Sequence, residues 1–288
     1  MNKSNSVKVD PCIILLDNGS LIAASTINLR KLAEKLSARS NRVIHPVSLL
    51  HSAKIHKSEM DGIPAEILEP FLLDMLNAGT SNFLILPLFF GQTAAVYEFI
   101  PQRLKEIRRQ WPQIEVRIAS CLVNLDDDSD HSMAEILSRV VKNKIITEEL
   151  QRPAIAVVDH GTPRIAVNEV RNLVCRHLRN ELRNEYGEVK AASMERRKGT
   201  EYDFNDPLLE DLLGSQGFDR DVVVALLFSS PGRHAGEGGD IAEICKQSEL
   251  SHKGLRVFIA DLPSTDKEFF ELLTARLRQS LSESPVTD

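Results

Sequence analysis

The stretch VVDHGT at residues 157–162 has a near counterpart, LLDNGS, at residues 15–20. In both, an apolar run ends in an aspartate, a polar residue, a glycine and a small hydroxyl residue. An apolar run that stops at such turn residues is typical of a buried strand leading into a loop. We therefore expect the chain to use this strand-and-loop unit twice.

Apolar runs of strand length alternate with amphipathic segments of helical length along the chain. This alternation is typical of βα units around a parallel sheet. The candidate strands are residues 12–17, 43–50, 83–90, 115–122, 154–159, 188–194, 222–228 and 255–261. The clearest helical patterns are at residues 26–38, 94–110, 132–150, 166–182 and 266–281.

Further matches between the two halves follow in the same order. LPLFFGQTAAVYEFI (86–100) corresponds to ALLFSSPGRHAGEGGDI (225–241) when two residues are inserted, and VRIASCL (116–122) corresponds to LRVFIADL (255–262). Internal duplication explains these matches. We predict an α/β fold of two similar lobes with parallel sheets, residues 1–150 and 151–288, which face each other across a cleft.

Composition excludes several classes of protein. The 288 residues are 42% hydrophobic and 26% charged, which is typical of a soluble globular protein. A net charge of -6 argues against nucleic-acid or membrane binding, because both need a basic surface. The first ten residues lack the apolar core of a signal peptide, so we expect a cytoplasmic protein. The four cysteines fit no zinc-binding spacing, and we expect them to be reduced and mostly buried.

Three residues with metal-binding side chains follow expected strands of the second half. His160 ends the first strand, Glu195 ends the second, and His234 follows the third in a glycine-rich loop. Ligands of parallel α/β sheets bind outside the carboxyl ends of the strands, so the three side chains should share one edge. Two imidazoles and a carboxylate suit a divalent transition metal and can also take up protons near neutral pH.

The first half lacks most of these ligands. The alignment places Asn18 opposite His160, Thr93 opposite His234, and His51 opposite Glu195. We therefore expect the second lobe to carry the metal chemistry and the first lobe to supply the opposite wall of the cleft.

The strings VVDHGTP, with Asn168 shortly beyond, and LLFSSPGRHAGEGGDIAEI resemble the class II tetrapyrrole chelatases, the sirohydrochlorin cobaltochelatase and ferrochelatase (CbiX-type) family. The resemblance covers nearly the whole chain through its two repeats and implies a pair of flavodoxin-like lobes. It implies that His160, His234 and Glu195 are the metal-binding and catalytic residues. The expected reaction inserts Co²⁺ or Fe²⁺ into sirohydrochlorin or a similar tetrapyrrole, with no cofactor beyond the metal.

The resemblance also suggests how the ring is held. Sirohydrochlorin is a polycarboxylate, and guanidinium groups bind carboxylates through paired hydrogen bonds. Basic residues near the expected strand ends are Arg164, Arg196, Arg197, Lys198 and Arg233. The predicted substrate contacts are Gly161, Arg164, Arg196, Ser230, Gly232 and Arg233.

Other interpretations stay open. Glu195 could pair with Arg196 or Arg197 on a solvated face. A metal or tetrapyrrole carrier that lost turnover is the main alternative function, favoured by the degenerate first lobe. A hydrolase using Ser229 or Ser230 is disfavoured, because the GxSxG elbow is absent. Both lobes lie in one chain, so a monomer could be complete.

Overall fold

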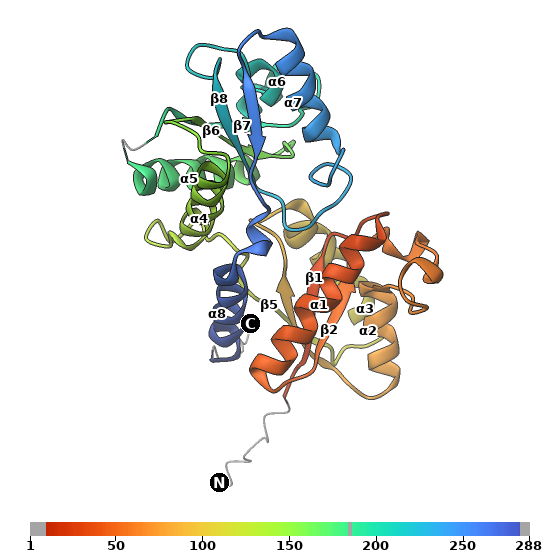
Figure 1. Ribbon diagram of the computed structural model, residues 1–288. Coiled ribbons are helices and arrows are strands. Elements are labelled where there is room, and N and C mark those ends of the chain that lie inside the picture. The colour runs from red at the N-terminus through yellow and green to blue at the C-terminus, as the bar shows by residue number, and fades with distance from the viewer. Residues whose placement is uncertain (1–9, 184–185, 283–288) are drawn as a thin grey trace. The chain divides into compact units, whose positions relative to one another are not determined.

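The computed structural model describes residues 10–183 and 186–282. Within that part, contacts divide the chain into two compact units (Figure 1). The first unit contains residues up to 88, residues 94–120 and the C-terminal residues from 276, and the second contains residues 89–93 and 121–275.

The first unit is built on a five-stranded parallel sheet in the order β3-β2-β1-β4-β5. Its strands are β1 (Cys12–Asp17), β2 (Ile44–Ser48), β3 (Glu66–Ile67), β4 (Asn82–Pro87) and β5 (Glu115–Ile118). The helices are α1 (Ala23–Ser40), α2 (Leu68–Asn77) and α3 (Ile100–Arg108), with a π-helical turn at Ala95–Phe99 before α3. Residues 13–16 of β1 are all buried, as expected for a central strand covered on both faces.

The second unit repeats this plan with a four-stranded parallel sheet in the order β7-β6-β8-β9. Its strands are β6 (Ala154–Asp159), β7 (Val189–Ser193), β8 (Asp221–Leu226) and β9 (Arg256–Ile259). Its helices are α4 (Ser132–Thr147), α5 (Ile165–Leu182), α6 (Leu209–Leu212) and α7 (Asp240–Ser251), while α8 (Lys267–Ser282) runs from the second unit into residues of the first.

Alternate residues of the second sheet bury opposite faces. Ala156 and Val158 of β6 share one hydrophobic cluster with Leu212 of α6 and Cys245 of α7. The intervening strand residues therefore face the other side, where α4 packs against α5 and contacts β8. The sheet is covered on both faces, and its polar groups are concentrated at the strand ends.

The division between units differs from the expected boundary near residue 150. Helix α4 precedes that boundary but belongs to the second unit, because its apolar residues Met133, Leu137 and Val141 are buried and the helix contacts α5 and β8. The end of α8 belongs to the first unit, where Arg117 donates a hydrogen bond to the carbonyl oxygen of Ser280. Each of these helical segments therefore belongs to the unit built mainly from the other half of the sequence. The periodicity of the strands does not reveal this exchange.

The predicted fold class is confirmed: both units are parallel α/β lobes, and each of the eight predicted strands overlaps an observed one. The short strand β3 and the helices α2 and α7 were not among the predicted elements. Cys121, Cys175 and Cys245 are buried, and all four cysteines are free. Among the described residues, no helix is long and apolar enough to cross a membrane.

Candidate metal-binding site

His160 is presented by the turn that follows β6. Gly161 adopts a φ of 90°, and a Cβ at this position would collide with the carbonyl oxygen of Glu195, so a glycine is required. The Nδ1 atom of His160 lies 3.2 Å from the carbonyl oxygen of Gly161. Because a carbonyl only accepts hydrogen bonds, Nδ1 carries the hydrogen in the tautomer that makes this contact, and Nε2 is then the nitrogen with the lone pair.

Glu195 follows β7 and lies beside His160. Its backbone N–H donates to the carbonyl oxygen of His160 at 3.2 Å. Its Oε1 atom lies 3.5 Å from Nε2 of His160. The carboxylate therefore faces the free nitrogen of the imidazole. Both side chains are exposed enough to meet a ligand.

His234 lies in the loop between β8 and α7, and Asp240 holds its ring. Nδ1 of His234 is 2.6 Å from Oδ2 of Asp240. The loop folds back on the start of α7, because Asp240 and Ile241 donate backbone hydrogen bonds to the carbonyl oxygens of Arg233 and His234. A carboxylate on Nδ1 again leaves Nε2 as the free nitrogen, as in many metal-binding histidines.

The two imidazoles are neighbours. The ring centroids of His160 and His234 are 4.7 Å apart, and the rings are nearly perpendicular at 76°. Both nitrogens left free by these contacts are Nε2, and Glu195 adds a carboxylate oxygen next to one of them. In the described part of the chain, no three His, Cys, Asp or Glu side chains converge on one point as a closed ligand set. The three side chains are neighbours, but they do not form a ready-made set of three metal ligands.

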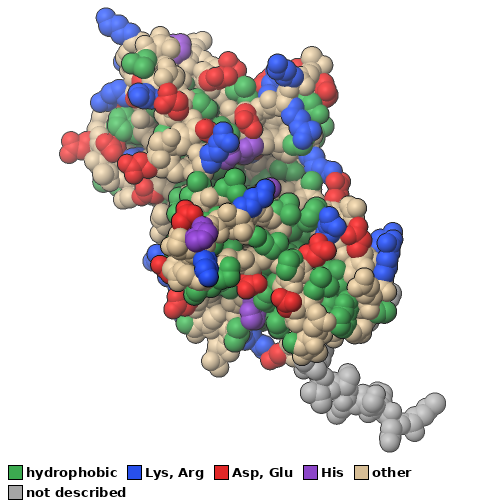
Figure 2. Space-filling view, turned by 90° about the vertical axis from the view of Figure 1, so that its right-hand side faces the viewer, with side chains coloured by type: hydrophobic (Ala, Val, Ile, Leu, Met, Phe, Trp, Pro, Cys, Tyr) green, Lys and Arg blue, Asp and Glu red, His purple; other side chains and the backbone are tan. Residues whose placement is uncertain are grey.

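An open pocket of about 530 Å³ lies beside these residues. It is lined by Glu195 and Asp240 of the site, by Arg233, and by residues of α7 such as Glu243. Four of its eleven lining residues carry carboxylates. Over the face drawn in Figure 2, charged side chains of both signs are interspersed with hydrophobic ones.

The first unit repeats the backbone of this site without its ligands. Leu50 donates a backbone hydrogen bond to the carbonyl oxygen of Asn18 at 3.2 Å, as Glu195 does to His160. Gly19 has a φ of 82°, and a Cβ there would collide with the carbonyl oxygen of Leu50. The counterpart of Glu195 is therefore Leu50, and the alignment that placed His51 there was one residue out of register.

Five of the six predicted substrate residues lie in or next to the loops that carry the two histidines. Gly161, Ser230, Gly232 and Arg233 lie in the loops that carry the two histidines, and Arg164 immediately precedes α5.

Arg196 is engaged within its own loop. Its Nη1 lies 3.0 Å from Oδ1 of Asp203 and its Nε lies 2.8 Å from Oδ1 of Asp206. The alternative pairing of Glu195 with Arg196 is thus not the arrangement observed, because Arg196 pairs with these aspartates and Glu195 lies against His160.

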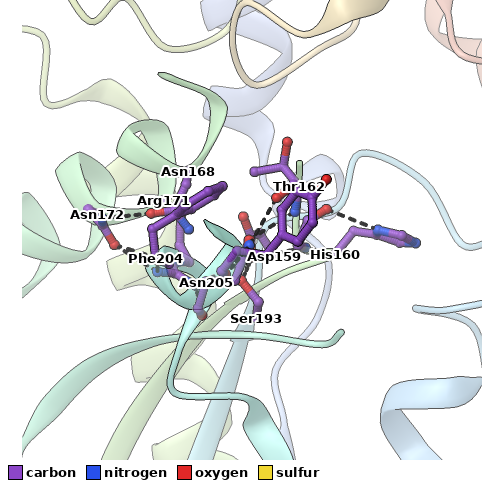
Figure 3. Close-up of polar contacts among 11 residues, drawn as sticks. Asp159, His160, Thr162, Asn168, Arg171, Asn172, Ser193, Phe204 and Asn205 are labelled. Carbon is purple, nitrogen blue, oxygen red and sulfur yellow. Dashed lines mark hydrogen bonds and ion pairs between the residues drawn. The ribbon is translucent and has the colours of Figure 1, made fainter. Parts of the chain in front are cut away.

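A buried polar network lies under the histidine turn (Figure 3). Asp159 accepts hydrogen bonds from the backbone N–H of Gly161 at 3.1 Å and from Oγ of Ser193 at 2.6 Å. Arg171 of α5 is only 2% exposed and donates from Nη1 to Oγ of Ser193 and, at 2.8 Å, to the carbonyl oxygen of Asn205. In Figure 3 the ring of His160 points away from this network.

Burial controls the charge of the aspartates that end β1 and β6. It raises the pKa of Asp159, while Ser193 and the charge of Arg171 act in the opposite direction. Burial likewise raises the pKa of Asp17, the counterpart in the first unit, to about 6.

Asp240, Arg171 and Asn205 are polar residues of the site that the sequence reasoning missed. Asp240 stood inside the quoted glycine-rich motif, six residues after His234. Arg171 left a signal too, because it is a charged residue on a helical face that also carries Val174 and Leu178. Asn205 left none, because it ends a short 3-10 helix and its partners Thr162 and Arg171 are 43 and 34 residues away in the sequence.

Comparison with known proteins supports the fold. No protein-family model and no curated protein sequence matches the chain. Among solved structures, SirB from Bacillus subtilis with Fe³⁺ matches with a TM-score of 0.65 and 12% identity over 95% of this chain and 96% of that one. The sirohydrochlorin chelatase SirB from Bacillus subtilis subspecies spizizenii, in complex with cobalt, matches with a TM-score of 0.61 and 14% identity over 94% and 95% of the two chains.

A third structure, CbiX, described as the terminal enzyme for biosynthesis of siroheme in denitrifying bacteria, matches with a TM-score of 0.56 and 12% identity over 94% of this chain and 100% of that one. The chain therefore has the fold of the class II tetrapyrrole chelatases. Of these three similar structures, one is described as a sirohydrochlorin chelatase in complex with cobalt.

Proposed function

We propose that this chain is a metal chelatase that inserts Co²⁺ or Fe²⁺ into sirohydrochlorin or a similar tetrapyrrole. The observation that carries the proposal is the pair of imidazole rings 4.7 Å apart, with Glu195 beside one of them, at the strand ends of a chelatase fold. No redox or organic cofactor is needed for this reaction. The incoming metal is a substrate.

The metal is captured by the two free Nε2 atoms and the carboxylate of Glu195. Neutral imidazole and carboxylate are suitable ligands for Co²⁺ and Fe²⁺. Three protein ligands leave positions for water, and ring nitrogens must replace those waters during insertion. An open site favours this exchange, whereas a closed shell of four ligands would retain the ion.

Insertion also releases two protons. Each pyrrole N–H bond breaks with its electron pair left on nitrogen, that pair forms the bond to the metal, and the proton passes to an acceptor. Glu195 and each imidazole that the metal leaves are the acceptors within reach, and they return the protons to water. The net reaction exchanges one divalent cation for two protons on the ring.

The ring's carboxylates need cationic partners. Arg233 is 78% exposed beside the site, and Arg197 and Lys198 are exposed on the loop after Glu195. We assign these three to the carboxylates, together with Arg164. Arg196 has a different role, since Asp203 and Asp206 already occupy its guanidinium and hold the loop in shape.

The first test is an anaerobic absorbance time course of sirohydrochlorin with Co²⁺, corrected for spontaneous insertion. The wild-type protein is expected to accelerate insertion, and His234→Ala is expected to abolish the acceleration while remaining folded. His56→Ala is the matched control, because His56 is an exposed histidine of the first unit. Near-normal turnover by His234→Ala would refute the assignment.

A carrier of metal or tetrapyrrole is the second candidate function. It is favoured by the first sequence repeat, where Asn18, Leu50 and Thr93 stand at the three ligand positions. A carrier would bind the ring or the metal tightly and stoichiometrically, without any rate enhancement. The same time course separates the two functions, because a carrier shifts the substrate spectrum without accelerating insertion.

A further inference from the structure

We propose that Arg171 is a positioning residue that holds the His160 turn and the Glu195 loop at the separation needed to bind one metal ion. The proposal rests on the proposed function, and it adds a role for a buried residue that touches neither metal nor ring. It is drawn from a difference between the two copies of the repeat.

The guanidinium of Arg171 joins the segments that carry both ligands. Nη1 donates to Ser193, which ends β7 two residues before Glu195, and to the carbonyl oxygen of Asn205. Nη1 also lies 3.8 Å from Oδ1 of Asp159, the residue before His160. One buried side chain thus links the end of β6, the end of β7 and the far end of the Glu195 loop.

The remaining donors of Arg171 are also engaged. Nε and Nη2 donate to Oδ1 of Asn172 at 3.2 and 3.1 Å, and Nη2 lies 3.4 Å from the carbonyl oxygen of Phe204. A buried guanidinium with partners on all three nitrogens holds its neighbours in a fixed geometry. Loss of the cation would leave the carboxylate of Asp159 buried without its compensating charge.

Asn205 completes the link. Its Oδ1 accepts from the backbone N–H of Thr162 at 2.9 Å, and its Nδ2 donates to the carbonyl oxygen of the same residue at 2.9 Å. The first unit has the same reciprocal contact: Oγ of Ser52 accepts from the N–H of Ser20 and donates to its carbonyl oxygen. Ser52 is therefore the counterpart of Asn205.

The copies differ in how this contact is tied to the strand. In the first unit, Oγ of Ser52 lies within direct hydrogen-bond distance, 3.0 Å, of Oγ of Ser48, four residues earlier. In the second unit a longer segment, residues 194–204, separates Ser193 from Asn205, and Arg171 bridges them. That segment carries Glu195 and the basic residues that follow it.

Helix α1 has no cation at the equivalent position, and the arginine that follows, Arg30, donates instead to the carbonyl oxygens of Met60 and Ile63. Both α1 and α5 have 18 residues, and counting from Asn18, Leu29 stands where Arg171 stands counted from His160. Leu29 is buried. The arginine is thus present in the copy with the long ligand-bearing loop, and leucine is present in the copy without ligands. A structural need common to both lobes would not explain this difference.

The test compares apo protein variants in a Co²⁺ titration followed by visible absorption. Arg171→Leu installs the residue of the first unit, Arg171→Lys keeps the charge, and Arg179→Leu is the matched control. Arg179 lies on the same helix and also donates to a strand backbone, at Val189, but at the opposite end of β7. Melting temperature and circular dichroism verify that each variant is folded.

We expect Arg171→Leu to bind Co²⁺ roughly 10- to 100-fold more weakly, the usual cost of removing support behind metal ligands. Arg171→Lys should recover much of this loss, and Arg179→Leu should bind like the wild type. In turnover assays, Arg171→Leu should lower kcat and raise the KM for Co²⁺. The KM for the tetrapyrrole ring should stay unchanged. A folded Arg171→Leu variant with wild-type Co²⁺ affinity, or equal losses in both leucine variants, would overturn the proposal.

If Arg171→Leu does not fold, Asn205→Ser tests the same link with the residue of the first unit, and the same loss of affinity is expected. The ring ¹⁵N shifts of His160 provide a readout without metal: they should move in the Arg171 and Asn205 variants and not in Arg179→Leu. A wild type that binds no Co²⁺ would refute the proposed function, whereas unmoved His160 shifts would refute the positioning role.

Discussion

Asp17 and Asp159 occupy equivalent positions, because each ends the first strand of its unit and accepts from the glycine two residues later. Each also pairs in register with a serine of the neighbouring strand, Ser48 or Ser193. The second unit adds the cation of Arg171 and the first does not. Burial raises the pKa of the aspartate in both units, but the charge of a neighbouring arginine opposes this rise only in the second.

This difference predicts an effect of pH on stability. The pKa of Asp17 is raised to about 6 in the folded protein, above the roughly 3.9 of an unfolded aspartate. The folded state thus holds the proton more tightly, so the free energy of unfolding falls as pH rises from about 4 to about 6 and stays lower above that range. Asp17→Asn should remove this loss, which amounts to at most about 3 kcal/mol.

The measurement is urea denaturation between pH 4 and 8. Asp17→Asn is expected to show a flatter profile than the wild type, with the gain in relative stability at the alkaline end. Asp74→Asn, an aspartate in α2, serves as the control and should follow the wild type. Parallel profiles for Asp17→Asn and the wild type would contradict the prediction.

Asp240 orients the ring of His234 through Nδ1. Replacing Asp240 should therefore weaken metal binding more than it lowers the stability of the fold. Asp240→Asn keeps the shape but removes the anionic acceptor, so Co²⁺ affinity should fall by about 10-fold. Isothermal titration of apo protein measures this directly. Glu243→Gln is the matched control, because Glu243 lines the same pocket from α7 and bonds Gln247 instead. Equal affinities in the two variants would exclude the orienting role.

The turn after β6 is the element on which the site depends most. Gly161 needs both its positive φ and the space beside the carbonyl oxygen of Glu195. Gly161→Ala should therefore combine backbone strain with displacement of the Glu195 loop, at a cost of roughly 1–3 kcal/mol or more in stability. Turnover should be lost even where the protein stays folded.

Gly254→Ala separates the two causes. Gly254 has a similar φ of 97°, but nothing lies within 4 Å of the position that a Cβ would occupy there. This variant should lose stability from strain alone and keep its Co²⁺ affinity, measured alongside Gly161→Ala by thermal melting and metal titration. If both variants lose affinity equally, the collision with Glu195 is not the cause.

For the whole molecule, the unequal lobes predict a stoichiometry. The three candidate ligands lie in the second unit, and the equivalent positions of the first repeat are Asn18, Leu50 and Thr93. One Co²⁺ per chain is therefore expected in a direct titration with elemental analysis, and the double variant His160→Ala/His234→Ala should bind none at this site. Two equivalent ions per chain would show that the first lobe also binds metal.

All three ligands also come from one chain, so no partner chain is required to complete the set. Metal affinity should then be independent of protein concentration. The same titration at low and high protein concentrations, with the mass in solution measured in parallel, checks this. An affinity that rises on self-association would show that a second copy contributes.

Local pattern was sufficient for every described strand except the two-residue β3, for the parallel arrangement and for the choice of candidate ligands. An apolar run of five or six residues followed by aspartate, a polar residue and glycine is compatible with few local structures other than a buried strand and a turn. The duplication showed which positions of the two halves to compare. His160 and His234 could be chosen because each stands in a glycine-containing loop after such a run, where a structural role is hard to assign. These signals all lie within short stretches of sequence.

Contacts between distant segments decided the rest. The pairing of Leu50 with Asn18 depends on strand register, which the sequence alignment missed by one residue. The assignment of α4 and the end of α8 to the opposite units depends on helix packing across the sequence halves. The free Nε2 atoms and the guanidinium of Arg171 beneath them depend on partners that folding brings together, because hydrogen bonds and buried charges are selected by distance in space and not by distance along the chain.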